Sequence, residues 1–110
     1  MNHSQIETLS FAMHLHLATR LRQDPILLAK MKTCIDSWLA SGRCAGSTEY
    51  LHEWLDAIQK GSNAVVSLAT DTTERGQVLR SCSPFGVIWN DPKERWDFIQ
   101  KWKDSHGCHR

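Results

Sequence analysis

The hydrophobic residues of this chain recur at intervals of three and four over most of its length. This spacing is the period of an amphipathic α-helix and differs from the alternation expected of a half-buried strand. In the first stripe, for example, Leu9, Met13 and Leu17 stand four residues apart. Similar patterns, or helix-terminating residues, delimit six segments, at about residues 4–22, 24–42, 47–61, 62–70, 71–79 and 91–104.

Several of these segments begin and end with residues that favour helix termini. Ser4 and Glu7 have the spacing of a capping box, in which each side chain bonds a free backbone amide of the first turn. Asp24-Pro25 and Asp91-Pro92 each pair a capping carboxylate with a proline suited to the first helical turn. Gly42, and likewise Gly61 further on, stands where a helix is expected to end.

Three features interrupt the helical pattern. The adjacent β-branched residues Val65 and Val66 leave either a helix or a strand open for residues 62–70. Gly76 weakens the middle of the next predicted helix. The run Ser83-Pro84-Phe85-Gly86 predicts an irregular turn, because proline restricts the residue before it and glycine widens the choice of backbone angles.

The length and composition fit one helical domain. The chain has 110 residues, of which 41% are hydrophobic, and this is enough to close a single core. No linker or internal repeat divides it. We therefore predict an all-α fold, a compact bundle of five to six short helices in one domain over residues 1–105, with a flexible C-terminal tail at 106–110.

The charge and cysteine content bound the cellular setting. Thirteen basic against twelve acidic residues give a formal net charge of +1, without the basic excess typical of proteins that bind nucleic acid. No segment has the roughly 20 apolar residues of a membrane-spanning helix or the pattern of a signal peptide, so we expect a cytoplasmic protein with no membrane partner. We interpret the scattered cysteines as thiols: Cys34, Cys44, Cys82 and Cys108.

The residues that bear chemistry form no recognisable catalytic or metal-binding motif. His106-Gly107-Cys108-His109 is the densest group of metal-ligating types, but the chain lacks the paired close cysteines of a structural zinc site. His14 and His16 fall on different faces of a helix. We therefore predict no catalytic residue, metal or cofactor, and keep a small enzyme without a known motif as an alternative.

The tryptophan content favours a protein-binding surface. Five tryptophans are more than one small core easily covers. We expect Trp38, Trp54 and Trp96 to fill the core, which leaves Trp89 and Trp102 for an interface. The alternative is a helical DNA-binding regulator that uses the basic helix 93–103 or a helix-turn-helix around Gly61.

The C-terminal third resembles a group of small bacterial helical proteins that act in toxin–antitoxin-like modules. The resemblance rests on Leu79-Arg80, Ser83-Pro84-Phe85-Gly86 and Glu94-Arg95-Trp96. It implies an antitoxin-like or regulatory subunit that binds and restrains a partner protein, such as a toxin or effector encoded nearby. The predicted partner contacts are Arg80, Phe85, Trp89, Arg95 and Trp102.

Two of these contact residues have a second interpretation. Arg80 and Arg95 are also suited to pair with the carboxylates at 91, 94 or 97, and so to fix the turn at residues 83–90 against the last helix. The oligomeric state and the identity of the partner stay open.

Overall fold

The computed structural model describes residues 2–43 and 45–107, and within these ranges it is helical and contains no strand. The elements are α1 (His3–Gln23), α2 (Leu27–Ser41), η1 (Ala45–Ser47), α3 (Thr48–Lys60), α4 (Ser62–Ala69), α5 (Glu74–Ser81), η2 (Pro84–Ile88) and α6 (Pro92–Ser105), where η marks a 3₁₀ helix. The predicted all-α class is confirmed. The segment at 62–70, for which the sequence allows either a helix or a strand, forms the helix α4.

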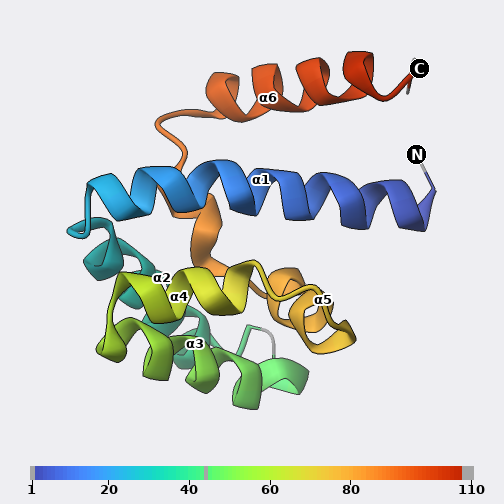
Figure 1. Cartoon of the computed structure of the whole chain (residues 1–110). Helices are drawn as coiled ribbons and strands as arrows, with labels where there is room; N and C mark the ends of the chain where they lie inside the picture. Colours follow the sequence, from blue (N-terminus) through green and yellow to red (C-terminus); the bar gives the residue numbers. More distant parts are fainter. Residues whose placement is uncertain (1, 44, 108–110) are drawn as a thin grey trace.

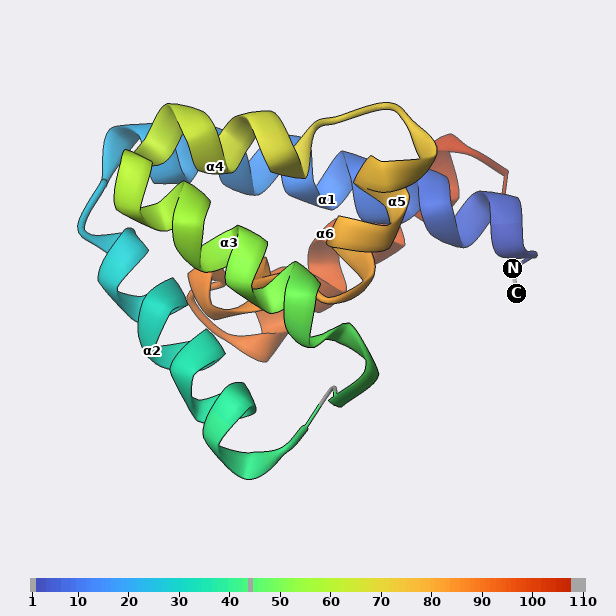
Figure 2. The same ribbon diagram turned by 90° about the horizontal axis from the view of Figure 1, so that it is seen from below.

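The helices are arranged around α1. In Figure 1, α6 lies along one side of α1, while α2, α3, α4 and α5 lie on the other. The view from below shows α3 running beside α4, and α2 beyond it (Figure 2). The chain passes from α5 to α6 through η2, which packs against both α1 and α2. The molecule measures 38 × 30 × 25 Å.

Two groups of buried apolar residues hold these layers together. The larger, called here the main core, joins α1–α5 and η2 and is built around Trp54 and Phe85, which are both almost fully buried. The indole Nε1 of Trp54 donates a hydrogen bond to the carbonyl oxygen of Leu79 at 3.0 Å, so the polar atom of this ring is satisfied inside the core. The smaller group, called here the α6 cluster, has the buried residues Leu9, Ile99 and Trp102.

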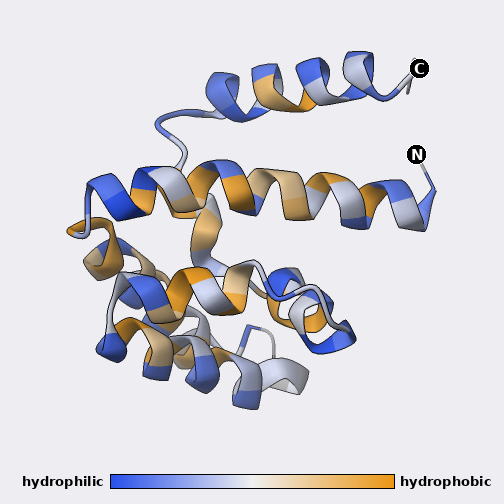
Figure 3. Ribbon diagram, in the orientation of Figure 1, coloured by the Kyte–Doolittle hydropathy of each residue, from blue (hydrophilic) through white to orange (hydrophobic). Residues whose placement is uncertain are grey.

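The hydrophobic residues follow this division. Figure 3 shows apolar residues along much of α1 and α4, whereas the first turn of α6 is hydrophilic and its apolar residues lie in its middle turns. A helix with such a narrow apolar stripe packs on one side only. The outer side of α6 is therefore left to solvent.

The helix ends confirm some predicted caps and correct others. Gly42 is left-handed with φ 73°, and Gly61 has φ 120°, so both close their helices where expected. The predicted capping box at Ser4 was wrong: Asn2 and Gln5 form it instead, with bonds of 2.9 and 3.0 Å.

The start of α2 also differs from the prediction. The helix begins at Leu27, and the residue before it, Ile26, has no side chain that can accept a hydrogen bond. Asp24 contributes its backbone carbonyl, which accepts from the amide of Leu27 at 3.1 Å. The interpretation of Asp24 as a side-chain cap was therefore wrong, because a backbone turn over Pro25 and Ile26 precedes the helix.

Gly76 has a steric role that the sequence pattern did not indicate. It is buried in α5, and a Cβ atom built on it would lie 1.9 Å from the backbone oxygen of Asp71. The chain before α5 thus folds back onto the helix so closely that no larger residue fits without a shift. The side chain of Asp71 stabilises this bend by accepting a hydrogen bond from the amide of Thr73 at 2.8 Å.

The predicted tail at 106–110 lies partly outside the described residues. His106 and Gly107 form a turn after α6, and the His106 ring stacks on Trp102 with 4.2 Å between centroids. Residues 108–110, and with them half of the His106–His109 group, are not described. Among the described helices, none combines the length and apolar character needed to span a membrane.

Candidate functional site

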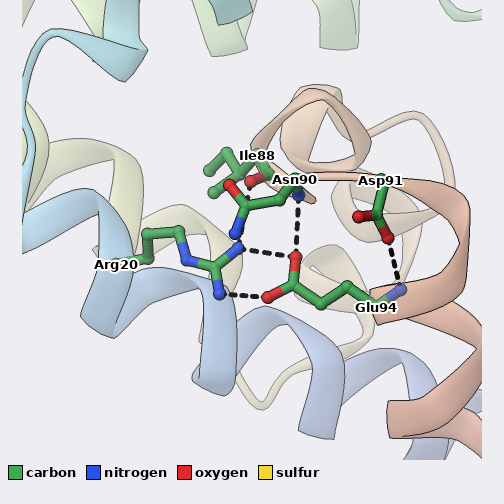
Figure 4. A network of polar contacts seen from close by, with 5 residues as sticks. All are labelled: Arg20, Ile88, Asn90, Asp91 and Glu94. Carbon is green, nitrogen blue, oxygen red and sulfur yellow. Dashed lines mark hydrogen bonds and ion pairs between the residues drawn. The ribbon is translucent and has the colours of Figure 1, made fainter.

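The junction of α6 with α1 is held by an ion pair between residues 74 positions apart in the chain. Arg20 of α1 donates from Nη1 to Glu94 Oε1 at 2.9 Å, and its Nη2 makes a second bond to Oε2 of the same carboxylate. Nη1 also donates to the carbonyl oxygen of Ile88 at 3.2 Å. Figure 4 shows the guanidinium facing both groups. Such a two-pronged contact fixes direction as well as distance.

The same carboxylate organises the chain that leads into α6. Glu94 Oε1 accepts the backbone amide of Asn90 at 2.7 Å, while Asp91 Oδ1 accepts the amide of Glu94 at 2.8 Å as a helix cap (Figure 4). The hydrogen bonds from Arg20, followed by that from Asn90, lower the pKa of Glu94 to about 2. The carboxylate is therefore charged over the physiological range and holds η2, α1 and α6 in one arrangement.

Aromatic rings line this junction. Trp89 stacks on His16 of α1 with 5.7 Å between ring centroids, and lies the same distance from Phe98 of α6. His16 and Phe98 are 5.0 Å apart. Trp89 is half-buried and His16 is exposed, so the edge of this aromatic trio is open to solvent.

A histidine and a serine form a second link, between α1 and η2. His14 Nδ1 donates to the carbonyl oxygen of Ser10 at 2.7 Å, which leaves Nε2 to accept from the hydroxyl of Ser83 at 2.8 Å. Ser83 Oγ in turn accepts the amide of Phe85 at 3.0 Å and caps η2.

This pair has the connectivity of a hydrolase base and nucleophile, but its environment favours a structural role. His14 is only 6% exposed, and burial lowers its pKa to about 4. Neither residue lines any of the five pockets described in the molecule. A nucleophile needs a substrate within reach of its oxygen. The bonds of His14 and Ser83 therefore serve to fix η2 against α1.

The five residues predicted to contact a partner do not gather on one surface. Arg80, Phe85 and Trp102 are buried in the monomer, at 7%, 1% and 7% exposure. Trp89 is half-buried in the aromatic trio, and Arg95 is exposed on α6. The structure thus brings Trp89 and Arg95 to the α6 side and encloses the other three.

The tryptophans expected in the core are divided as well. Trp54 is fully buried as predicted, and Trp38 packs half-buried against the main core. The prediction for Trp96 was wrong, because its side chain is 59% exposed on α6. Trp96 is the most exposed of the tryptophans in the described part of the chain and carries the largest apolar side chain on the uncovered side of that helix.

Arg80 and Arg95 do not make the contacts proposed for them with the carboxylates of the last helix. Arg80 instead donates to the carbonyl oxygens of Ala69 and Asp71, at 3.2 and 2.7 Å, and so closes the end of α4. The arginine that fixes the turn against α6 is Arg20. Sequence reasoning missed it because no local pattern relates a residue in the first helix to one in the last.

The described residues border several pockets but form no cluster of metal ligands. One pocket among the described residues, of about 700 Å³, lies between α2 and α3 and is bordered by the exposed Lys32–Asp36 ion pair, whose atoms are 2.7 Å apart. A second, of about 610 Å³, is lined by Cys34 and Val87 and is mostly apolar. Within the described ranges, no three histidine, cysteine or acidic side chains come together to hold a metal.

Comparisons with known proteins do not add to this picture. Neither the protein-family models, nor the curated proteins, nor the solved structures give a significant match to the chain.

Proposed function

We propose that the protein is an interaction module that binds and restrains a partner protein, and that the outer side of α6 is its binding surface. The exposure of Trp96 is the observation that carries this proposal. A tryptophan that keeps more than half of its surface in water has no packing role that requires so large a ring, whereas tryptophan is among the commonest anchors of protein interfaces.

The charges around Trp96 indicate the chemistry of the partner. Arg95 and Lys101 are exposed on the same helix, about 100° and 140° around its axis from Trp96. Within the described residues neither of them has an ion pair, whereas the exposed Lys93 pairs with Asp97. Basic residues that flank an aromatic anchor on both sides of a helix favour an acidic surface, which they attract over distance and orient on contact. We therefore propose that the partner presents an acidic segment with an apolar side chain that covers Trp96.

The position of α6 supports this choice of surface. It is attached to the rest of the molecule through α1 and η2, and in Figure 1 no other described helix lies over its outer side. The resemblance of the C-terminal third to toxin–antitoxin-like proteins includes Glu94-Arg95-Trp96. An antitoxin-like or regulatory role in the cytoplasm follows as part of the proposal, and the free thiol of Cys34 fits a reducing compartment.

The test is to isolate the partner from the native host with the tagged protein and then measure its affinity for variants. Trp96→Ala is expected to weaken binding by about thirtyfold, as loss of an interface anchor typically does. Ile26→Ala is the matched control, because Ile26 is also an exposed apolar residue, at 75%, but lies between α1 and α2. Circular dichroism is expected to show the same helix content in both variants.

Two outcomes would contradict the proposal. Equal binding by wild type and Trp96→Ala would exclude α6 as the surface. Binding to duplex DNA that is lost steeply with added salt, and lost on substitution of Arg95 and Lys101, would show that the basic residues of α6 contact phosphate instead.

A further inference from the structure

A small polar pocket lies on the side of α1 away from α6. It has a volume of about 200 Å³ and is formed by the first half of α1 together with α5 and the loop before it. Its lining residues are Glu7, Thr8, Phe11, Thr72, Gln77 and Arg80. Pockets for drug-sized ligands span about 300–1,000 Å³. This one therefore suits a smaller molecule.

Arg80 is the most firmly placed of these residues. Its Nη1 is held by the carbonyl oxygens of Ala69 and Asp71, and its guanidinium carbon lies 4.9 Å from the centre of the Phe11 ring. The residue is 7% exposed, yet its Nε is buried without a hydrogen-bond partner in the protein. A buried donor without a partner costs stability, so a site that keeps one has donor capacity to offer a ligand.

Glu7 faces the same pocket with the opposite charge. Its Oε2 is also buried without a hydrogen-bond partner. Glu7 and Arg80 form no ion pair in the described structure. They are close enough to interact, however: burial lowers the pKa of the Arg80 guanidinium, and the charge of Glu7 raises it in part. The pocket is thus lined by a cationic residue with an unused hydrogen-bond donor, Arg80 Nε, and by an anionic residue with an unused acceptor, Glu7 Oε2.

We propose that this pocket binds a small zwitterion of amino-acid size, whose carboxylate is held by Arg80 and whose ammonium group is held by Glu7. A simple anion would be repelled by Glu7, and a simple cation by Arg80. A molecule with both charges satisfies both side chains with charge-assisted hydrogen bonds. Because neither unused atom is open to solvent, binding requires side chains that line the pocket to shift; of the two charged residues, Glu7 is the more exposed.

The experiment is an NMR titration of the whole ¹⁵N-labelled chain with three probes, namely glycine, acetate and methylammonium. Glycine is expected to give saturable shifts of the amides of Thr72 and Gln77, while the two singly charged probes bind at least about tenfold more weakly. In Glu7→Gln, glycine is expected to bind about tenfold more weakly and acetate more tightly, because the repelling carboxylate is gone. Glu7→Asp keeps the charge and is expected to retain part of the preference for glycine.

Glu74→Gln is the matched control, since Glu74 is an exposed carboxylate of α5 that does not line the pocket. Glycine binding by this variant is expected to equal that of the wild type. The proposal is overturned if glycine gives no saturable shift in the folded wild-type chain. It is equally overturned if Glu7→Gln, shown to be folded by its amide spectrum, binds glycine and acetate as the wild type does.

Discussion

The main core and the α6 cluster are two very different ways of joining helices in one short chain. The main core contains buried side chains from α1 to α5 and η2, with Trp54 and Phe85 in contact at its centre, 5.9 Å between rings. Among the described residues, the α6 cluster buries the three residues Leu9, Ile99 and Trp102. At its other end α6 is held by the Arg20–Glu94 ion pair and by the half-exposed aromatic trio.

This difference indicates that stability is distributed unevenly over the molecule. Buried apolar area is the main favourable contribution to folding, and regions with little of it open at lower free energy than the whole protein. We expect α6 to open before the main core does. The helix that carries the proposed binding surface is thus also the helix that we expect to open first.

The strongest test of the comparison is to damage the main core. Trp54→Ala is expected to lower the free energy of unfolding by about 3–5 kcal/mol, because it leaves a large cavity and removes one of the donors to the Leu79 carbonyl oxygen, which also accepts from the amide of Cys82. Urea unfolding followed by circular dichroism measures the change. A loss shared by all helices is expected, since α1–α5 meet around this ring.

Trp102→Ala is the counterpart of that variant in the α6 cluster. Its effect is expected to be confined to α6, where hydrogen exchange of the backbone amides should accelerate while α3 and α4 stay protected. If the two tryptophan variants unfold the whole chain alike, the α6 cluster and the main core are one cooperative unit and the comparison fails.

A second test addresses the close packing of α5. Gly76→Ala is expected to destabilise the protein by about 3 kcal/mol, because the added methyl group meets the backbone of Asp71 and neither can yield without a shift of the bend. Gly86→Ala is the matched control: a Cβ atom at Gly86 meets no atom within 4 Å. Thermal unfolding of both variants checks the prediction, and equal melting temperatures would show that the bend before α5 adapts freely.

A third test uses pH to act on the link that His14 makes between α1 and η2. Burial, and after it the charge of Arg80, holds the pKa of His14 at about 4, against 6.5 for a free histidine. The stability that neutral His14 contributes is full above pH 6.5 and is lost as the pH falls toward 4. Between pH 7 and pH 5 the loss is about 2 kcal/mol by proton linkage.

The measurement is urea unfolding at both pH values for wild type and His14→Gln. Glutamine can keep a hydrogen bond to Ser83 without taking up a proton, so this variant is expected to lose most of that pH dependence. If the unfolding free energy of His14→Gln depended on pH as that of the wild type does, the dependence would come from other histidines and not from His14.

Much of the fold is predictable because helices are local. The spacing of apolar residues located all six helices, and Gly42, Gly61 and Asp91 marked ends that the structure confirms, since each acts on backbone groups within a few positions of itself. Gly76 shows the limit of the same reasoning. Its cost to helix propensity is local, whereas its benefit depends on the chain that folds back against it.

The surface could not be predicted in the same way. Trp96, Ile99 and Trp102 stand three residues apart, so each is turned about 60° from the last around the helix and the set spans about 120°. The spacing indicates that one edge of this arc is buried. Whether the buried edge is that of Trp96 or that of Trp102 depends on where α1 lies. The structure buries Trp102 and exposes Trp96, the reverse of the expectation from sequence.

The smallest expected effect lies at the other attachment of α6. Glu94→Gln removes the ion pair with Arg20, whose side chains are only about a quarter exposed, and should weaken the docking of α6 by about 1 kcal/mol. Hydrogen exchange in α6 is expected to quicken about fivefold, with no change in α3. Asp97→Asn is the control, since its pair with Lys93 is well exposed and should contribute little.

The same ion pair also predicts a dependence on pH. Because the pKa of Glu94 is held near 2 against an ordinary 4.5, the stability that the ionised carboxylate contributes is complete above pH 4.5 and is lost as the pH falls toward 2. The range from pH 4.5 to 2 begins where the loss of stability from His14 is nearly complete. Acid should therefore weaken the main core first and the docking of α6 by Glu94 afterwards. If the main core and the docking of α6 were lost together between pH 6.5 and 4, α6 would be held by the main core and not by Glu94.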